Sequence, residues 1–154
     1  MKLFIVTLLI FIDFLSKKII YNLIDLNNFV SVMPFLDIIH IHNYGISFGL
    51  LAGVLPVWFI VIFGIIIVFF LIYWMIKSAN KYEKWGILFI IAGAISNIGD
   101  RLLNHYVLDF IYINFDKYYW PAFNFADIYI SLGVMLIIIQ SVLVVKTKFK
   151  EKDV

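Results

Sequence analysis

The stretch VLPVWFIVIFGIIIVFFLIYWMI, residues 54–76, decides how the whole chain is interpreted. It carries no Asp, Glu, Lys or Arg, and about 20 apolar residues are enough for a helix to cross a bilayer. The complete chain has 154 residues, of which 64% are hydrophobic and 14% charged, whereas soluble domains are about 25% charged. The sequence therefore predicts a single integral membrane domain that covers residues 1–154.

Three further segments are apolar enough to accompany this span. Residues 85–99 and 128–145 are uncharged, and both reach a comfortable spanning length when the charged residues at their edges are included. Residues 3–23 resemble a signal peptide, but no small-residue cleavage site follows, so we expect a retained span. We predict four transmembrane helices, at about residues 3–23, 54–76, 84–103 and 125–145.

The placement of lysine predicts the orientation of these helices. Basic residues precede the first span, fill the connection between the second and third, and follow the fourth: Lys2; Lys77, Lys81 and Lys84; Lys146, Lys148, Lys150 and Lys152. Residues 25–53 contain no Lys or Arg, and residues 102–124 contain only Lys117. The positive-inside rule then puts both termini in the cytoplasm and the two lysine-poor connections outside, in a multi-pass protein of the cell membrane.

The two outer connections are rich in residues that favour strands. Residues 35–42 (FLDIIHIH) and 107–113 (VLDFIYI) predict a small extracytoplasmic β-sheet at the membrane interface. Residues 43–51 predict a turn into a short helix on the membrane surface. The fold class expected is an all-α membrane protein of four helices, with a small sheet and a surface helix. Aromatic side chains suited to the interface lie in the same region: Tyr112, Tyr118, Tyr119 and Trp120.

Two acids stand in short polar interruptions of this apolar sequence, at the end expected to face outward. Asp109 lies within a strand-like stretch and Asp127 opens the last span. A solvated loop acid would explain Asp109, and an acid at a helix N-terminus would explain Asp127. Two carboxyls in contact cannot both ionise, however, so one would keep a proton while the other acts as a base toward water. The pair therefore indicates acid–base chemistry.

Other polar residues suggest supporting roles. Asp13 and Lys17 are spaced i,i+4 in the first span, which favours either a structural ion pair or an ion pathway. The outer end of the third span contains three polar residues, Asn97, Asp100 and Arg101. They fit either a solvated helix end or a cluster of hydrogen-bond donors. The absence of cysteine excludes disulfides, thiolate metal sites and a cysteine nucleophile.

One alternative aspartate can be set aside. Gly99-Asp100 is similar to part of the Gly-x-Gly-Asp motif of presenilin-like intramembrane proteases, but Asn97 occupies the position of the first glycine. We also expect the neighbouring Arg101 to keep Asp100 ionised, which does not suit a pair that shares a proton. HExxH, P-loop and GxGxxG motifs are absent, so zinc-protease and nucleotide-binding functions lose their usual support.

Five short motifs, taken in order, resemble the lipoprotein signal peptidase (signal peptidase II) family. They are DFLSK (13–17), NYGISFG (43–49), GAISNIGDR (93–101), VLDF (107–110) and FNFAD (123–127). Together they extend over nearly the whole chain. Ser96 stands where the family usually has glycine, and we expect only a local change in packing there.

The resemblance implies a bacterial aspartic endopeptidase with no metal or other cofactor. Such enzymes remove signal peptides from prolipoproteins just before a diacylglyceryl-modified cysteine. Membrane lipid would be a further partner, no nucleic acid is expected, and a monomer is the simplest assembly. The resemblance assigns catalysis to Asp109 and Asp127, substrate binding to Asn43, Asn97, Arg101 and Asn124, and structural support to Asp13, Lys17, Gly45 and Asp100.

Two other functions fit parts of the sequence. A small proton-coupled transporter would use Asp13, but a transporter needs its acid near the bilayer midplane and reachable from both sides. A non-catalytic membrane scaffold would leave the outer carboxylates replaceable. The grouping of most acids at one end favours the peptidase.

Overall fold

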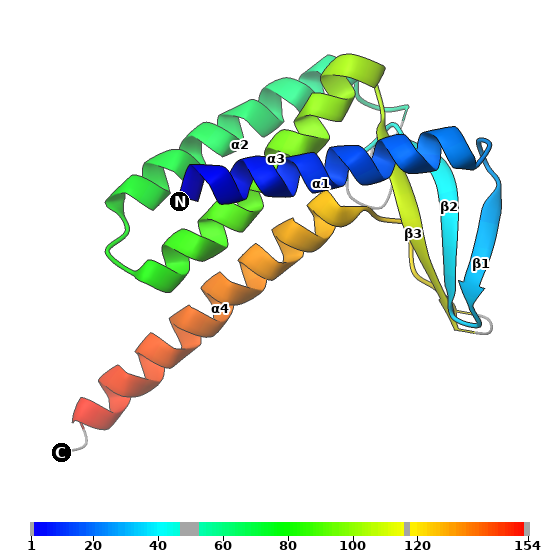
Figure 1. Cartoon of the computed structure of the whole chain (residues 1–154). Coiled ribbons are helices and arrows are strands. Elements are labelled where there is room, and N and C mark those ends of the chain that lie inside the picture. The colour runs from blue at the N-terminus through cyan, green and yellow to red at the C-terminus, as the bar shows by residue number, and fades with distance from the viewer. Residues whose placement is uncertain (1, 47–52, 116–117, 153–154) are drawn as a thin grey trace.

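The computed structural model describes residues 2–46, 53–115 and 118–152, with side chains as far as residue 144. Four helices occupy one part of the molecule, and a sheet projects from one end of them (Figure 1). The elements in chain order are α1 (Lys2–Leu23), β1 (Phe29–Met33), β2 (Leu36–Asn43), α2 (Val57–Lys77), α3 (Lys81–Asn104), β3 (Val107–Phe115), β4 (Tyr118–Tyr119) and α4 (Phe125–Lys152).

Helix α3 is the element against which the other helices pack. Asn80 caps its start, because the side-chain oxygen accepts the backbone N–H groups of Tyr82 and Glu83. The end of α3 is marked by His105 in the left-handed conformation, at φ 67°. The core between α2 and α3 is built from four buried aliphatic side chains: Val68, Leu71, Ile87 and Ile91.

Small residues let α3 and α4 approach closely. A Cβ atom added at Gly93 of α3 would overlap the carbonyl oxygen of Ala126 in the first turn of α4. Gly86 and Gly133 face each other in the same way farther along the two helices, where a Cβ atom on Gly86 would lie 2.7 Å from the carbonyl oxygen of Gly133. Such contacts between small residues are how membrane helices pack when no hydrophobic effect drives them together.

The sheet is antiparallel, in the order β1-β2-β3-β4. Asn43 at the end of β2 pairs with Val107 at the start of β3, and Ile41 pairs with Asp109. On the other side of β3, the backbone of Phe123 bonds to Phe110 and Ile111. The sheet therefore brings the start of β3, the end of β2 and the segment leading into α4 to one place.

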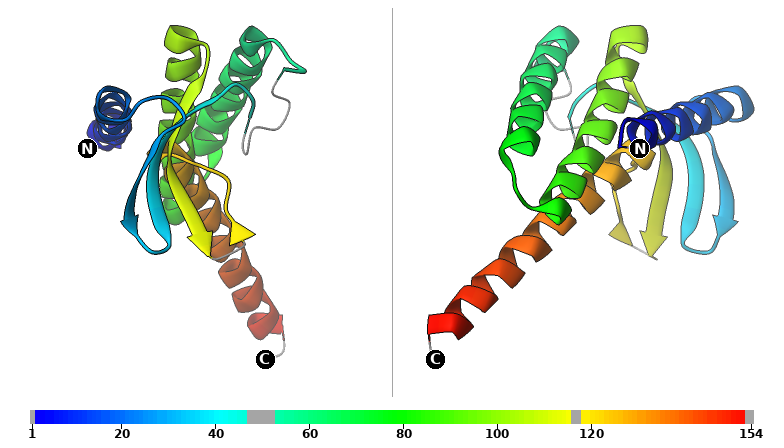
Figure 2. Two further views of the ribbon diagram at one scale, coloured as in Figure 1. Left: turned by 90° about the vertical axis from the view of Figure 1, so that its right-hand side faces the viewer. Right: turned by 60° about the vertical axis from the view of Figure 1, so that its left-hand side comes forward.

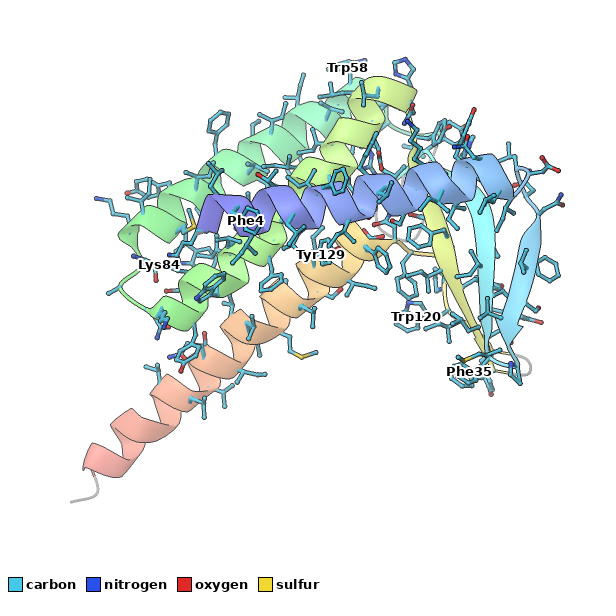
Figure 3. All side chains as sticks on the ribbon, in the orientation of Figure 1. Phe4, Phe35, Trp58, Lys84, Trp120 and Tyr129 are labelled. Atoms are coloured by element: carbon cyan, nitrogen blue, oxygen red, sulfur yellow. The ribbon has the colours of Figure 1, made fainter. Side chains whose placement is uncertain are left out.

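The two ends of the molecule differ. The start of α1, the α2–α3 connection and the far end of α4 lie away from the sheet, as the views in Figures 1 and 2 agree. Figure 3 shows Lys84 at the α2–α3 end, with Phe35 and Trp120 at the sheet end. This arrangement places the lysine-rich connection and the aromatic connection at opposite ends of the helices.

Most of the expected elements are present. Four helices form within the described residues, and α2, α3 and residues 125–144 of α4 are each long and apolar enough to cross a membrane. Helix α1 carries Asp13, Lys17 and Lys18 and is not among the helices that meet this criterion in the described part of the chain. The expected strands at 35–42 and 107–113 are confirmed as β2 and β3.

The sheet is larger than expected, because β1 and β4 were not predicted. Alternating Val30, Ser31 and Val32 are a strand signal that could have revealed β1. The surface helix expected over residues 43–51 lies largely outside the described residues, of which residue 43 ends β2 and 44–46 follow it as an irregular segment.

Candidate active site

Asp109 lies in the buried first half of β3 and is only 3% exposed. Two asparagine side chains donate to its carboxylate. Asn124 Nδ2 lies 2.7 Å from Oδ1, and Asn43 Nδ2 lies 2.9 Å from Oδ2. Both oxygens of this buried acid therefore have a hydrogen-bond donor, as a buried polar group requires.

Asp127 lies in the first turn of α4, where a negative charge is favourable. Asn97 Nδ2 donates to Oδ1 at 2.9 Å, and the backbone N–H of Asn124 donates to Oδ2 at 3.1 Å. Asn124 thus contacts both acids, with its side-chain amide on Asp109 and its backbone on Asp127. The two aspartates, which are 18 positions apart in the chain (127 − 109), are joined by one fully buried residue.

The orientation of each asparagine amide is fixed by a group that can only donate. Gly45 N–H donates to Asn43 Oδ1 at 2.9 Å, the Lys17 ammonium to Asn97 Oδ1 at 3.1 Å, and Asp127 N–H to Asn124 Oδ1 at 3.1 Å. Each NH₂ group must therefore face a carboxylate, because an amide offers one acceptor end and one donor end. Three separate contacts therefore turn the three amides in the same sense, with each NH₂ group toward a carboxylate.

The electrostatic environment of Asp109 favours retention of a proton. Burial, and then the nearby charge of Asp127, raise the pKa of Asp109 from 3.8 to about 6, against the opposing hydrogen bonds from Asn43 and Asn124. Desolvation and a like charge both disfavour the ionised form of a carboxyl. This is the environment that an acid–base pair working near neutral pH needs.

Arg101 supports the site through backbone contacts. Its guanidinium donates to the carbonyl oxygens of Asn97 at 3.1 Å and Gly45 at 2.5 Å. Among the buried side-chain nitrogen and oxygen atoms of the described residues, its Nε is the one without a hydrogen-bond partner. Arg101 therefore holds the segment after β2 against the end of α3 and keeps one donor available.

The cation in direct contact with Asp100 is Lys17 rather than the neighbouring Arg101. Asp100 takes its hydrogen bond from Lys17, with Nζ 2.6 Å from Oδ2, whereas the guanidinium bonds to Asn97 and Gly45. Adjacent residues on a helix point in different directions, so sequence neighbours need not pair. Asp100 is paired with a cation, but the cation comes from α1.

Asp13 and Lys17 form the expected i,i+4 ion pair, at 2.6 Å, and both are buried. Asp13 also accepts the Ser96 hydroxyl at 2.5 Å and the backbone N–H of Ala126 at 2.9 Å. Ser96 therefore does more than alter local packing, since its hydroxyl bonds to an ion pair. Asp13 is fully buried and has a donor on each oxygen, which does not suit the carboxylate of a transporter.

A cavity of about 670 Å³ joins the two acids to the membrane-facing helices. Its polar end contains Asp109, Asp127 and the four residues expected to bind substrate: Asn43, Asn97, Arg101 and Asn124. Its apolar walls come from α2, α3 and α4, with Ile60, Gly64, Ile67, Ile90, Ala94 and Met135 among the lining residues. Among the residues that the structure describes, no three His, Cys, Asp or Glu side chains are grouped to hold a metal ion.

The sequence indicated which residues gather here but not all of their contacts. The capping role of Asn124, the hydroxyl of Ser96 and the backbone N–H of Ala126 were missed. An asparagine three residues before an acid at the start of a helix is a capping signal that could have revealed the first. A backbone donor from another helix leaves no such signal in the sequence.

The fold and the site together define a class: a membrane protein with a linked pair of aspartates, Asp109 buried and Asp127 partly buried, beside an apolar cavity. The model of the family described as Signal peptidase (SPase) II matches residues 5–143. The chain therefore belongs to the signal peptidase II family, the lipoprotein signal peptidases, which are membrane aspartic endopeptidases.

Individual relatives agree with this assignment. A lipoprotein signal peptidase of Bartonella henselae is 38% identical over 136 residues, which cover 86% of this chain and 82% of the relative. One from Haemophilus influenzae is 33% identical, over 93% and 86% of the two chains. A solved structure described as a bacterial membrane enzyme is 35% identical, covers 96% of this chain and 90% of its own, and has a TM-score of 0.88.

Proposed function

We propose that Asp109 and Asp127 are the catalytic pair with which this lipoprotein signal peptidase cleaves prolipoproteins, just before a diacylglyceryl-modified cysteine. The observation that carries the assignment is the bridge through Asn124, which bonds to both carboxyls at the polar end of one cavity. Two linked acids, one buried and one partly buried, suit the geometric need of general acid–base catalysis.

The chemistry follows from one proton shared by two carboxyls. The ionised carboxylate removes a proton from a water molecule, which attacks the scissile carbonyl carbon, while the protonated carboxyl donates to the carbonyl oxygen. The carboxyl that took the proton from water then passes it to the amide nitrogen. As the tetrahedral intermediate collapses, the C–N bond breaks, the amine of the cysteine is released, and one hydroxyl of the intermediate returns a proton to the other carboxylate. The pKa of Asp109, raised to about 6, keeps a fraction of this acid protonated near neutral pH, as a pair that shares one proton requires.

The residues around the pair serve to hold the substrate backbone. Arg101 carries the unpartnered buried Nε–H and lines the cavity, so it is suited to bind a peptide carbonyl oxygen. Asn43, Asn97 and Asn124 hold the acids and line the same space. The apolar walls suit the hydrophobic segment of a signal peptide, and the opening between membrane helices lets the lipid chains of the cysteine remain in the bilayer.

The orientation in the membrane is part of the proposal. Helix α1 serves as the fourth span, because Asp13 and Lys17 are buried against the protein while large apolar side chains such as Phe4 and Phe11 are exposed. The lysine-rich end of the helices then lies in the cytoplasm, and the aspartate pair lies at the outer face with the sheet at the interface. The chain forms one domain and acts as a monomer in contact with lipid.

Cleavage of a defined precursor tests the function. The purified enzyme is incubated with a diacylglyceryl-modified prolipoprotein and, as the control, with the same precursor lacking the lipid. We expect mass spectrometry to find a product that begins with the modified cysteine from the first precursor only. Equal cleavage of both precursors, or a cut at another bond, would contradict the proposed specificity.

Labelling in intact cells tests the orientation. The natural chain has no cysteine, so a single cysteine can be introduced without removing any other. We expect Tyr118→Cys to react with a membrane-impermeant maleimide and Lys81→Cys to react only after the cells are opened. The opposite pattern would place the aspartate pair on the cytoplasmic side.

A further inference from the structure

Lys17 does not contact either aspartate of the proposed catalytic pair, yet each N–H group of its ammonium has a defined acceptor. Its ammonium is buried and donates to Asp13 Oδ2 and Asp100 Oδ2, both at 2.6 Å, and to Asn97 Oδ1 at 3.1 Å. An ammonium has three N–H groups and no acceptor. All three are therefore used, and the third reaches a residue that itself contacts Asp127.

The contact with Asn97 determines what this residue can offer. Because Lys17 occupies the carbonyl oxygen of the Asn97 amide, the NH₂ group faces Asp127 and donates to Oδ1 at 2.9 Å. A flipped amide would put donor against donor at Lys17 and acceptor against acceptor at Asp127. The cation on α1 thus decides that Asp127 Oδ1 receives a hydrogen bond from α3.

We propose that Lys17 is a positioning residue for catalysis, acting through Asn97 to hold Asp127 in one orientation with Oδ1 as an acceptor. The inference rests on the proposed catalytic role of Asp127. It assigns to Lys17 a role in the reaction rate, in addition to joining α1 with α3 through its ion pairs with Asp13 and Asp100. A purely structural brace would affect stability and leave the turnover of the folded enzyme unchanged.

Removing the cation alone would leave the two acids that it contacts, Asp13 and Asp100, without a counter-charge, and breaking one side of a buried ion pair strongly destabilises a protein. The paired variant Lys17→Met with Asp100→Asn removes both charges together, and Asp13 keeps its donors from Ser96 and Ala126. The matched control is Asp100→Asn alone, in which Lys17 still reaches Asp13 and Asn97. The paired variant and the control are each made in the wild-type chain and in the Asn97→Ala variant. The kcat, KM and Tm of each full-length protein are then measured.

We expect kcat of the paired variant to fall by about 10- to 100-fold, the value of a hydrogen bond to a charged group, with KM little changed and the control near wild type. In the Asn97→Ala background the same pair of substitutions should cause no further loss of kcat. Lys17 is proposed to act on Asp127 only through the Asn97 amide, which this background lacks. A full additional loss in that background, or wild-type kcat in the paired variant, would overturn the proposal.

A second variant keeps the proposal open to refutation if the paired variant does not fold, because it removes the Asn97 donor through which Lys17 is proposed to act. Asn97→Asp keeps the shape and the contact with Lys17 but has no N–H to give to Asp127. We expect a folded enzyme with strongly reduced kcat, and wild-type kcat would refute the proposal. The Asp127→Asn variant distinguishes failure of the proposed function from failure of the role of Lys17. If Asp127→Asn still cleaves, the proposed function is wrong. If Asp127→Asn is inactive and the paired variant is fully active, only the proposed role of Lys17 is wrong.

Discussion

Asn124 and Asp127 exchange two hydrogen bonds across the first turn of α4. The backbone N–H of Asn124 donates to Asp127 Oδ2, and the backbone N–H of Asp127 donates to Asn124 Oδ1, each at 3.1 Å. This is the reciprocal pattern of a capping box, with Asn and Asp in place of the more usual Ser or Thr and Glu. The start of the last helix therefore fixes the orientation of Asp127, the proposed catalytic acid, and the Asn124 amide links it to Asp109.

The two roles of Asn124 can be separated by substitution. Asn124→Ser keeps an oxygen that can cap α4 but loses the donor to Asp109, whereas Asn124→Ala loses both. We expect both variants to lose about 10- to 100-fold in kcat/KM, since a hydrogen bond to a charged group is removed in each. Asn124→Ala should in addition be less stable than Asn124→Ser by about 1 kcal/mol, the usual value of a helix cap.

Thermal unfolding beside the cleavage assay checks this prediction. If Asn124→Ser cleaves as well as wild type, the amide is not needed on Asp109. If the two variants have the same Tm, the cap does not contribute to stability.

The contact between α3 and α4 sets the position of Asp127. Gly93→Ala places a Cβ atom against the carbonyl oxygen of Ala126, so α4 must shift at its start, and Asp127 is one residue farther along. Overpacking of this kind costs about 1–3 kcal/mol, and a displacement of about 1 Å in a catalytic group can cost about 100-fold in rate. We expect Gly93→Ala to have a lower Tm than wild type and to lose more activity than its loss of stability alone would cause.

Gly99→Ala is the matched control on the same helix, because a Cβ atom there has nothing within 4 Å. Gly99→Ala should cleave normally, and its free energy of unfolding should rise by up to about 1 kcal/mol because alanine has the higher helix propensity. Equal behaviour of Gly93→Ala and Gly99→Ala would show that the close approach is not required.

The raised pKa of Asp109 predicts a pH-dependent stability. Its pKa is about 6 in the folded enzyme, against 3.8 for an unperturbed group, so the folded state binds more protons between these values. The stabilising contribution of Asp109 is therefore complete below pH 3.8 and is lost as the pH rises through about 6, a change of roughly 3 kcal/mol.

Asp109→Asn removes this titration. The Tm difference between Asp109→Asn and wild type should move in favour of the variant as the pH rises from about 4 to about 7. Differential scanning fluorimetry in detergent at several pH values measures it. A difference that does not change with pH would show that Asp109 has an ordinary pKa.

Much of this architecture follows from features that a sequence displays directly. Long apolar runs, extended for α3 and α4 by the charged residues at their edges, predict α2, α3 and α4, and strand-forming residues in 107–113 predict β3. The i,i+4 spacing of Asp13 and Lys17 predicts their pairing, because the geometry of one helix is enough to bring them together. In each case the information is local.

Contacts between elements were less predictable. Nothing in the sequence shows that Lys17 reaches Asp100 and Asn97 on α3, because this depends on how α1 crosses α3. The junction of Asp109 with Asn124 likewise depends on the backbone bonds between Phe123 and β3. The family motifs named the residues of the site, but only the packing of α1, β3 and α4 around α3 explains why they meet.

The central claim is that Asp109 and Asp127 together perform the cleavage, and the most direct measurement is the rate of processing of a diacylglyceryl-modified prolipoprotein by Asp109→Asn and Asp127→Asn. Asp25→Asn, an exposed acid in the connection after α1, is the matched control. We predict that each variant of the pair stays folded and loses at least about 100-fold in rate, as expected for the loss of a general acid or base, while Asp25→Asn cleaves normally. Near-wild-type cleavage by either Asp109→Asn or Asp127→Asn would contradict the account.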